Sequence, residues 1–414
     1  MKILWVKPGK LLPLDTGGKL RTYNILRHLS GGHELTYLSY YGGLRDQTYE
    51  REIVAHLPGT IALHTGAPDS TPLERYLDYA WRFFWSAPYA VSKFTDPQVR
   101  KLLAPWIAQR RFDVAVCDFL SSALNFPDQL DTPTALFQHN VETILWRRKA
   151  ELEPRFLDRM ISKIEYAKMR RFEPEQVRRF HHVIAVSDAD RDLMKNMVDA
   201  SRISVVPTGV DLARYQYDPA AKPSGPLVVF TGSMDWEANI DGVEFFCKEV
   251  WPLVLAKIPA ARFRIVGRDP HPRVKKLASE SVEVTGTVPS ILDHLHEAAV
   301  FVVPLRIGGG TRIKIYEAMA VGKATVSTSV GAEGLDVQHE HDILLADDPV
   351  RFADAVSSVL QDETLRRRLE AAAAATAARF DWSVITERFV EVLRLTMNAA
   401  SVERGVESPA VVQV

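Results

Sequence analysis

The sequence is poor in the features that mark secreted, membrane-spanning and nucleic-acid-binding proteins. It has only two cysteines in 414 residues, Cys117 and Cys247. Both stand in apolar stretches, which predicts buried free thiols and excludes a disulfide or cysteine metal framework. No stretch approaches the roughly 18 apolar residues of a membrane-spanning helix. Lys and Arg number 51 against 52 Asp and Glu, so the chain carries no net charge that would attract nucleic acid.

Two standard phosphate-binding patterns are also missing. The chain contains neither G-x-x-x-x-G-K-[ST] nor a G-x-G-x-x-G that follows a strand and opens a helix. These absences argue against a P-loop enzyme and against a dinucleotide oxidoreductase.

Residues 1–7 have too short an apolar stretch for a signal peptide and predict a strand. The sequence therefore predicts a cytoplasmic protein.

Strand and helix patterns alternate along the chain in two successive series. The first series ends near residue 206, and a linker rich in proline, glycine and alanine follows at 218–226. The alternation restarts with an apolar strand at 227–231. Two βαβ series joined by one linker predict an α/β protein of two doubly wound, Rossmann-like domains, residues 1–217 and 227–381. Ligands of such sheets bind beyond the carboxyl ends of the strands, so we expect the site in the cleft between the domains.

The most informative stretch runs from Pro304 to Gly322. An apolar strand at 298–303 precedes it, three consecutive glycines interrupt regular structure, and a helical pattern begins near Thr311. The order of strand, glycine loop and helix N-terminus predicts an anion site, because free backbone N–H groups and the helix dipole both favour negative charge there. The backbone that would hold the anion belongs to Gly309, Gly310 and Thr311.

Two cations and one carboxylate give this stretch its chemistry. Arg312 and Lys314 fall in the first turn of the predicted helix, where positive charge opposes the dipole unless an anion is bound. Glu317 comes one turn later and can accept hydrogen bonds from a ribose. We interpret the stretch as a cradle for a diphosphate. A surface loop with solvated charges is the alternative.

Two further positions in the first half are candidate site residues. Gly17 and Gly18 stand at the entry of a predicted helix and are interpreted as a second backbone nest for an anion, with a plain helix entry as the alternative. His139 follows the apolar strand 134–137, at the end of the sheet where ligands bind. A structural histidine is the alternative at that position.

The first half also contains a segment dense in aromatic residues and arginine, residues 71–94. One interpretation is a buried helical hairpin. The other is a lid that binds the acceptor or faces a membrane, because amphipathic aromatics with basic residues suit an interface. Residues 141–182 carry 11 Lys and Arg against 7 Asp and Glu, which is typical of a solvated helix face and also compatible with an anionic surface.

Short motifs along the whole chain resemble one family. They include the glycine pair, His139, the V-P-T-G-V-D turn at 206–211, F-T-G ending at Gly232, V-T-G-T-V at 284–288 and Y-E-A-M-A at 316–320. The chain resembles the GT-B glycosyltransferases, and most of all the retaining family 4 group. The resemblance implies two Rossmann-like domains, a nucleotide-sugar donor held by the second, and a C-terminal helix, 382–400, that crosses back to the first.

Two departures from the family pattern stand out. The family often has two glutamates eight positions apart, and while the second matches Glu317, the first falls on Gly309. The family also often has an Arg and a Lys after the first glycine of the second domain, at positions that lie here around Ser233 and Asn239. We infer that the phosphate-binding charge has moved to Arg312 and Lys314, as in a bacterial subgroup with a G-G-G-T-R-x-K loop.

The resemblance implies transfer of a hexose, with retention, from a UDP-, GDP- or ADP-sugar to an acceptor hydroxyl in bacterial polysaccharide, glycolipid or glycoconjugate synthesis. It implies no metal and no cofactor; an Asp-x-Asp at 188–190 opens a helix and is not read as a metal motif. His139 would orient the sugar, and Arg312 and Lys314 would stabilise the leaving diphosphate. The base pocket and phosphate contacts would come from Gly232, Arg268, Thr287 and Val288.

The acceptor would be a saccharide, a lipid-linked sugar or a small molecule, with peripheral membrane contact through the first domain. A GT-B nucleotide-sugar epimerase and a catalytically silent nucleotide-sugar-binding protein are the alternatives.

Overall fold

The chain folds into two compact units. The computed structural model describes residues 1–65, 72–153, 155–307 and 312–403. Unit 1 combines Met1–Pro207 with the chain from Ile385 onward, and unit 2 is Thr208–Val384. The sequence placed the end of the first domain at residue 217. Residues from Thr208 onward belong instead to unit 2, because the N–H of Val210 donates to the carbonyl of Phe380 at 2.8 Å and Ser224 bonds to Glu297.

Unit 1 is built on a seven-stranded parallel sheet with the order β3-β2-β1-β4-β5-β6-β7. Its central strands β1 and β4 are almost wholly buried, as expected when helices cover both faces of a parallel sheet. The edge strand β3 is only half-buried. The strands are β1 (Lys2–Pro8), β2 (Glu34–Tyr41), β3 (Thr60–His64), β4 (Val114–Asp118), β5 (Thr134–Phe137), β6 (His182–Ala185) and β7 (Ile203–Val205).

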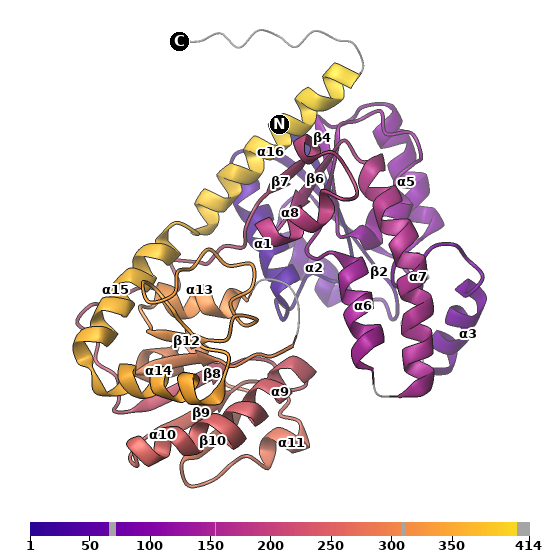
Figure 1. Ribbon diagram of the computed structural model, residues 1–414. Coiled ribbons are helices and arrows are strands. Elements are labelled where there is room, and N and C mark those ends of the chain that lie inside the picture. Colours follow the sequence, from indigo (N-terminus) through magenta and orange to yellow (C-terminus); the bar gives the residue numbers. More distant parts are fainter. Residues whose placement is uncertain (66–71, 154, 308–311, 404–414) are drawn as a thin grey trace, which may run out of the picture. The chain divides into compact units, whose positions relative to one another are not determined.

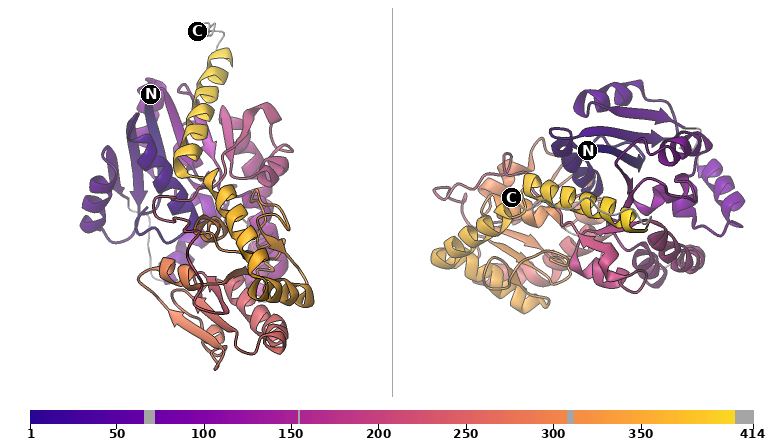
Figure 2. Two further views of the ribbon diagram at one scale, coloured as in Figure 1. Left: turned by 90° about the vertical axis from the view of Figure 1, so that its left-hand side faces the viewer. Right: turned by 90° about the horizontal axis from the view of Figure 1, so that it is seen from above.

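Helices lie on both faces of this sheet (Figures 1 and 2). Several begin at a residue whose side chain accepts a hydrogen bond from the first turn, such as Thr16, Asp46 and Asp96. The cap of α8 is Ser187, which accepts from the N–H of Asp190 at 3.1 Å. The helices are α1 (Gly17–Leu29), α2 (Gln47–His56), α3 (Pro72–Arg82), α4 (Tyr89–Ser92), α5 (Pro97–Ala108), η1 (Leu120–Asn125), α6 (Glu142–Leu152), α7 (Phe156–Arg179), α8 (Asp188–Met194) and η2 (Ala200–Arg202).

Unit 2 repeats this plan with a six-stranded parallel sheet in the order β10-β9-β8-β11-β12-β13. The strands are β8 (Leu227–Thr231), β9 (Arg262–Val266), β10 (Val282–Gly286), β11 (Val300–Val303), β12 (Thr325–Ser327) and β13 (Leu344–Leu345). The helices are α9 (Glu237–Phe245), η3 (Phe246–Val250), α10 (Trp251–Lys257), α11 (Pro272–Lys275), α12 (Ile291–Glu297), α13 (Ile313–Ala320), α14 (Pro349–Gln361) and α15 (Glu363–Ala378). The predicted fold class of two parallel-sheet α/β domains is confirmed.

The last helix, α16 (Trp382–Glu403), starts in unit 2 and belongs to unit 1 from Ile385. Its Phe389 is fully buried, and its ring centre lies 5.2 Å from those of Trp5 in β1 and Phe137 in β5. Aromatic pairs at this separation stabilise the packing of a helix beyond the area that they bury. This part of α16 thereby belongs to the core of unit 1.

The aromatic segment at 71–94 differs from the buried hairpin that the sequence favoured. It forms α3, a turn and the short α4, but Trp81 and Phe84 are 72% and 88% exposed. Residues 66–71 lie outside the described part of the chain. These exposures agree with the interpretation of the segment as an interaction surface.

Candidate functional site

The glycine-loop stretch places its two cations at the start of α13. The helix begins at Ile313 with Arg312 as its N-cap residue, later than the predicted start near Thr311. The predicted backbone ligands Gly309, Gly310 and Thr311 lie outside the described residues. Arg312 is 6% exposed, and its guanidinium lies 5.4 Å from the ring centre of Trp236. A buried guanidinium at a helix N-terminus has the charge that an anion site requires.

The amine of Lys314 lies at the carboxyl end of β8. It donates to the carbonyl of Thr231 at 2.6 Å and to Oδ1 of Asn239 at 3.2 Å. A Cβ on Gly232 would come within 2.7 Å of this amine, so a larger residue there would require the lysine side chain to shift. The lysine of α13 thus occupies the place beside Asn239, where the resemblance led us to expect a cation. Asn239 itself is 2% exposed and supplies the acceptor.

The electrostatics of this cluster favour an added negative charge. Burial, together with the positive charge of Arg312, lowers the pKa of Lys314 to about 7 against the opposing charge of Glu317. In the part of unit 2 that the structure describes, no carboxylate lies within ion-pair distance of the Lys314 amine. Two cations that share one buried helix end destabilise each other unless an anion compensates them. A bound diphosphate would supply that compensation.

Glu317 lies one turn along α13 and is held by a neighbour that sequence reasoning missed. The hydroxyl of Tyr215 donates to its Oε1 at 3.0 Å. Burial raises the pKa of Glu317, and the hydrogen bond from Tyr215 opposes that shift. With one oxygen anchored by a tyrosine that is 5% exposed, the second oxygen has a fixed position. This geometry suits a carboxylate that accepts hydrogen bonds from a diol such as ribose.

The other predicted ligands of unit 2 follow the ends of neighbouring strands. Arg268 comes after β9, where its Nε donates to Oγ of Ser233 at 2.9 Å. Thr287 is exposed and Val288 is half-buried directly after β10. Gly267 packs so tightly that a Cβ would lie 1.6 Å from the carbonyl oxygen of Gly232. The carboxyl ends of β8, β9 and β10 and the start of α13 therefore stand at one edge of the sheet, with several polar groups.

In unit 1, His139 lies in a buried polar network at the corresponding edge. Arg21 donates to its Nδ1 at 2.8 Å, so the other nitrogen carries the proton and donates to Oδ1 of Asp118 at 2.6 Å. Burial lowers the pKa of His139 to about 4, against the opposing charge of Asp118, and the ring is neutral at pH 7. Both nitrogens are occupied, so no ring atom remains for the sugar hydroxyl that the sequence led us to expect. Its part in catalysis stays a prediction, and the arrangement favours a positioning role.

Phe119 links this network to the predicted glycine nest. Its ring stacks on His139 with centres 3.8 Å apart, and a Cβ on Gly18 would lie 2.7 Å from its Cζ. Phe119 has a φ of +67°, which is strained for a bulky residue. Gly18 is therefore needed for close packing, and Gly17 begins α1 beside it. The buried amine of Lys7 lies 5.0 Å from the same ring.

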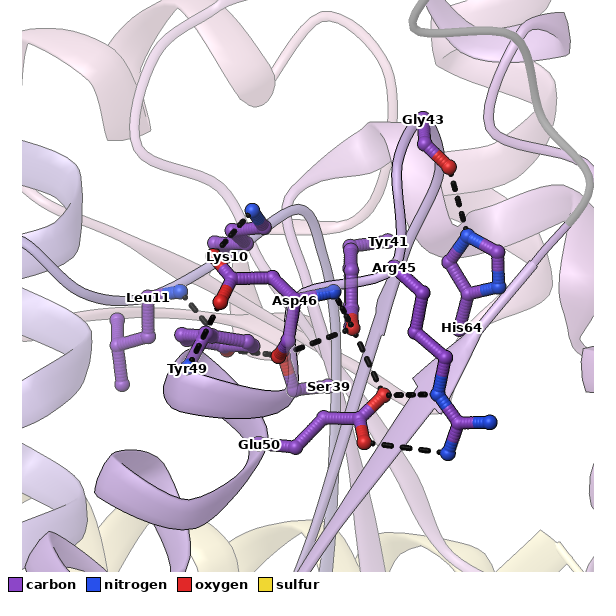
Figure 3. Close-up of polar contacts among 10 residues, drawn as sticks. All are labelled: Lys10, Leu11, Ser39, Tyr41, Gly43, Arg45, Asp46, Tyr49, Glu50 and His64. Carbon is purple, nitrogen blue, oxygen red and sulfur yellow. Dashed lines mark hydrogen bonds and ion pairs between the residues drawn. The ribbon is translucent and has the colours of Figure 1, made fainter.

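A second polar network fixes the loop that leads into α1 (Figure 3). Lys10 pairs with Asp46 at 2.8 Å, which ties the loop after β1 to the start of α2. The hydroxyl of Tyr49 accepts from the N–H of Leu11 at 3.0 Å and lies 2.6 Å from Oγ of Ser39. The loop in front of the glycine pair is thus bonded to the start of α2.

Sequence reasoning found some of these residues and missed others. Those it missed are Lys7, Arg21, Asp118, Phe119, Tyr215 and Trp236. A signal existed for Asp118, which ends an apolar strand as a lone carboxylate. None existed for Arg21 or Tyr215, because their partners are 118 and 102 residues away in the chain. Among the described residues, no three His, Cys, Asp or Glu stand together as a metal site.

Comparison with known proteins agrees with this architecture. A family model described as Glycosyltransferase Family 4 matches residues 21–214, and one described as Glycosyl transferases group 1 matches residues 225–362. The chain belongs to the family 4, group 1 glycosyltransferases. Within the described residues, no helix is long and apolar enough to span a membrane.

Individual relatives are distant. The chain is 26% identical over 237 residues to a phosphatidyl-myo-inositol mannosyltransferase of Mycolicibacterium smegmatis, covering 55% of this chain and 60% of that relative. Among solved structures, Anabaena HepE in complex with UDP and glucose superposes with a TM-score of 0.67 at 15% identity, covering 95% of this chain and all of that one. Sucrose-phosphate synthase of Thermosynechococcus elongatus gives 0.69 at 16% identity, covering 96% and 100%. The fold is GT-B.

Proposed function

We propose that this protein is a retaining glycosyltransferase that moves a hexose from a nucleotide diphosphate sugar to an acceptor hydroxyl. The observation that carries the proposal is the pair of cations at the N-terminus of α13, the buried Arg312 and the partly buried Lys314. Such a site suits the diphosphate of a donor, with Glu317 on the ribose and Arg268, Thr287 and Val288 around the base.

The chemistry follows from the charge that develops when the glycosidic bond breaks. The sugar leaves the diphosphate, whose oxygen gains negative charge, and preformed cations stabilise that charge without reorganising. Arg312 and Lys314 would do so, with backbone N–H groups of the glycine loop. The leaving phosphate oxygen would take the proton of the acceptor hydroxyl, so that attack on the same face retains the configuration. In unit 1, His139 would act as a positioning residue that holds Asp118 and Arg21 in place.

The acceptor and the pathway are proposed from the relatives. The mannosyltransferase named above has a phosphatidyl-inositol in its name, and a Campylobacter jejuni relative, 24% identical over 232 residues, is named for a diphospho-undecaprenol acceptor. HepE was solved with UDP-glucose as well as UDP. We propose a UDP-, GDP- or ADP-sugar donor, a saccharide or lipid-linked acceptor, and a cytoplasmic enzyme of bacterial glycoconjugate synthesis. Transfer and hydrolysis assays on the purified protein distinguish it from an epimerase and from a silent binder.

EDTA should leave activity largely unchanged. The cations of the proposed diphosphate site are side chains, so charge stabilisation does not require Mg²⁺ or Mn²⁺. The measurement is the initial rate with and without excess EDTA, using metal-free substrates. Loss of activity that Mg²⁺ or Mn²⁺ restores would contradict the metal-free mechanism.

His139→Ala should lower turnover while the affinity for a nucleoside diphosphate stays within a few-fold, because the phosphates and ribose bind to unit 2. It should also lower the melting temperature, since Asp118 and Arg21 each lose a partner. The matched control is His182→Ala, another buried histidine of unit 1, at the amino end of β6, whose Nε2 lies 2.8 Å from Oγ of Ser204. The control should lose stability but keep its turnover. Equal turnover in the two variants would show that His139 has no part in the site.

A further inference from the structure

Unit 1 exposes a group of large apolar side chains on two of its helical segments. We call it the outer patch. One part lies on α3 and the turn after it, and the other on the first turns of α7. Its members are Leu77, Trp81, Phe83, Phe84 and Trp85 on the first part and Phe156, Leu157, Met160 and Ile161 on the second. Exposed apolar groups gathered in this way mark an interaction surface.

At the start of α7, apolar side chains face the solvent and polar side chains are buried, which is the reverse of the usual pattern on a surface helix. Phe156 and Leu157 are 65% and 74% exposed, whereas the polar Ser162 and Glu165 are each 1% exposed. A helix whose only partner were the core of unit 1 would turn its apolar side inward. The exposed side of these turns is therefore suited to an apolar partner outside the protein.

Polar contacts hold the two parts of the outer patch together. Lys168 of α7 donates to the carbonyl of Phe83 at 2.7 Å and lies 5.2 Å from the centre of its ring. Glu165 accepts from the N–H of Tyr89 at 2.6 Å. Figure 1 shows α3 beside the first half of α7. These anchors leave the apolar side chains exposed while the backbone that carries them is fixed.

The charge around the outer patch is positive, although the whole chain has a net charge of −1. Residues 141–182 contain 11 Lys and Arg against 7 Asp and Glu, and two of those acids, Glu165 and Glu173, are buried. Arg155 and Lys163 are exposed on α7, and Arg159 lies 6.0 Å from the ring centre of Phe156. Tryptophan and phenylalanine interleaved with cations match the headgroup region of an anionic bilayer.

We infer that the outer patch docks unit 1 on the surface of an anionic lipid bilayer. Trp81, Phe84, Phe156 and Leu157 insert at the headgroup level, and the cations of α6 and α7 contact lipid phosphates. The inference goes beyond the proposed function and does not depend on it, because docking is measured without donor or acceptor.

The test is flotation of the full chain with vesicles of phosphatidylcholine alone or with about one-third phosphatidylglycerol. We expect binding to the anionic vesicles that weakens at high salt, as screening predicts. Phe84→Ser with Leu157→Ser should lower the bound fraction at least tenfold. Arg155→Glu with Lys163→Glu should lower it on anionic vesicles only. The control is Leu44→Ser, which changes a leucine 91% exposed outside the patch and should bind as the wild type.

Circular dichroism establishes that each variant is folded, and because all the changed side chains are exposed, we expect melting temperatures like that of the wild type. Failure of the folded wild-type protein to bind anionic vesicles would overturn the inference, as would binding that both patch variants retain. Concentration-dependent dimerisation that Phe84→Ser abolishes, without vesicle binding, would assign the outer patch to a second copy of the chain and would also overturn it.

Discussion

Replacing Lys314 or Arg312 by alanine is expected to lower turnover by about 10²–10³ while the fold stays intact. Each cation would stabilise the oxygen of the leaving diphosphate, and loss of one such stabiliser costs roughly 2.7–4 kcal/mol in the transition state. In Lys314→Ala the carbonyl of Thr231 and the side chain of Asn239 lose their shared donor. The site should then bind the donor more weakly as well as reacting more slowly.

Arg306→Ala is the matched control for this prediction. Arg306 stands in the same stretch between β11 and α13, but its guanidinium is bonded to both carboxylate oxygens of Asp241, at 3.1 and 2.7 Å. Its charge is therefore already compensated, and turnover should stay near that of the wild type. The measurement is the steady-state rate of each of the three variants, with equal amounts of folded protein. Near wild-type turnover in both Lys314→Ala and Arg312→Ala would contradict the assignment of a diphosphate site to the N-terminus of α13.

Asp118→Asn is expected to destabilise unit 1 by roughly 1–3 kcal/mol for each buried donor that is left without its acceptor. The carboxylate is fully buried and accepts from Trp5 at 3.0 Å, from Thr22 at 2.6 Å and from His139. It also faces the charge of the buried Lys7. Asparagine keeps the volume but removes the charge and points donor hydrogens at groups that are themselves donors.

Hydrogen exchange identifies the unit that is affected. Amides of β1 and β4 should exchange faster in Asp118→Asn, while β8 and β9 of unit 2 should be unchanged. Asp128→Asn, at an exposed carboxylate of unit 1, is the control and should change neither. Equal protection of β1 in the variant and the wild type would show that the network contributes little to stability.

The pH dependence of this effect has a defined sign. Burial alone would raise the pKa of Asp118, but His139, Lys7 and Thr22 together lower it below its usual value. A carboxyl whose folded pKa is lowered stabilises the fold above its unfolded pKa and loses that contribution as the pH falls through the folded value. The difference in unfolding free energy between wild type and Asp118→Asn should therefore shrink as the medium becomes acidic.

The fold was predictable because the signals that define it are local. Strands such as 227–231 and 262–266 are short apolar runs between turns, and their alternation with helical patterns identifies a doubly wound sheet. The boundary of unit 1 was harder to predict from the sequence. Residues after Pro207 read as a turn and a linker, and long-range hydrogen bonds such as that from Val210 to Phe380 join them to unit 2.

The candidate site was predictable in part for the same reason. The glycine loop is followed within a few residues by Arg312, Lys314 and Glu317. A diphosphate site could therefore be predicted from this short stretch alone. The role of His139 depends on Arg21 and Asp118, which lie far away in the chain and occupy both ring nitrogens. Likewise, the exposure of Trp81 and Phe84 depends on which side of their segment packs against α7. Composition allows either a buried hairpin or a surface, and tertiary contacts decide between them.

The central claim is that the N-terminus of α13 binds the diphosphate of a nucleotide sugar. The most direct test is the melting temperature of the wild type and of Lys314→Ala, each with and without UDP, GDP and ADP. A ligand at 100 times its dissociation constant stabilises a protein by about 2.7 kcal/mol. We predict that at least one of these nucleotides raises the melting temperature of the wild type, and that the rise is largely lost in Lys314→Ala. No rise with any of the three, or an equal rise in both proteins, would contradict the claim.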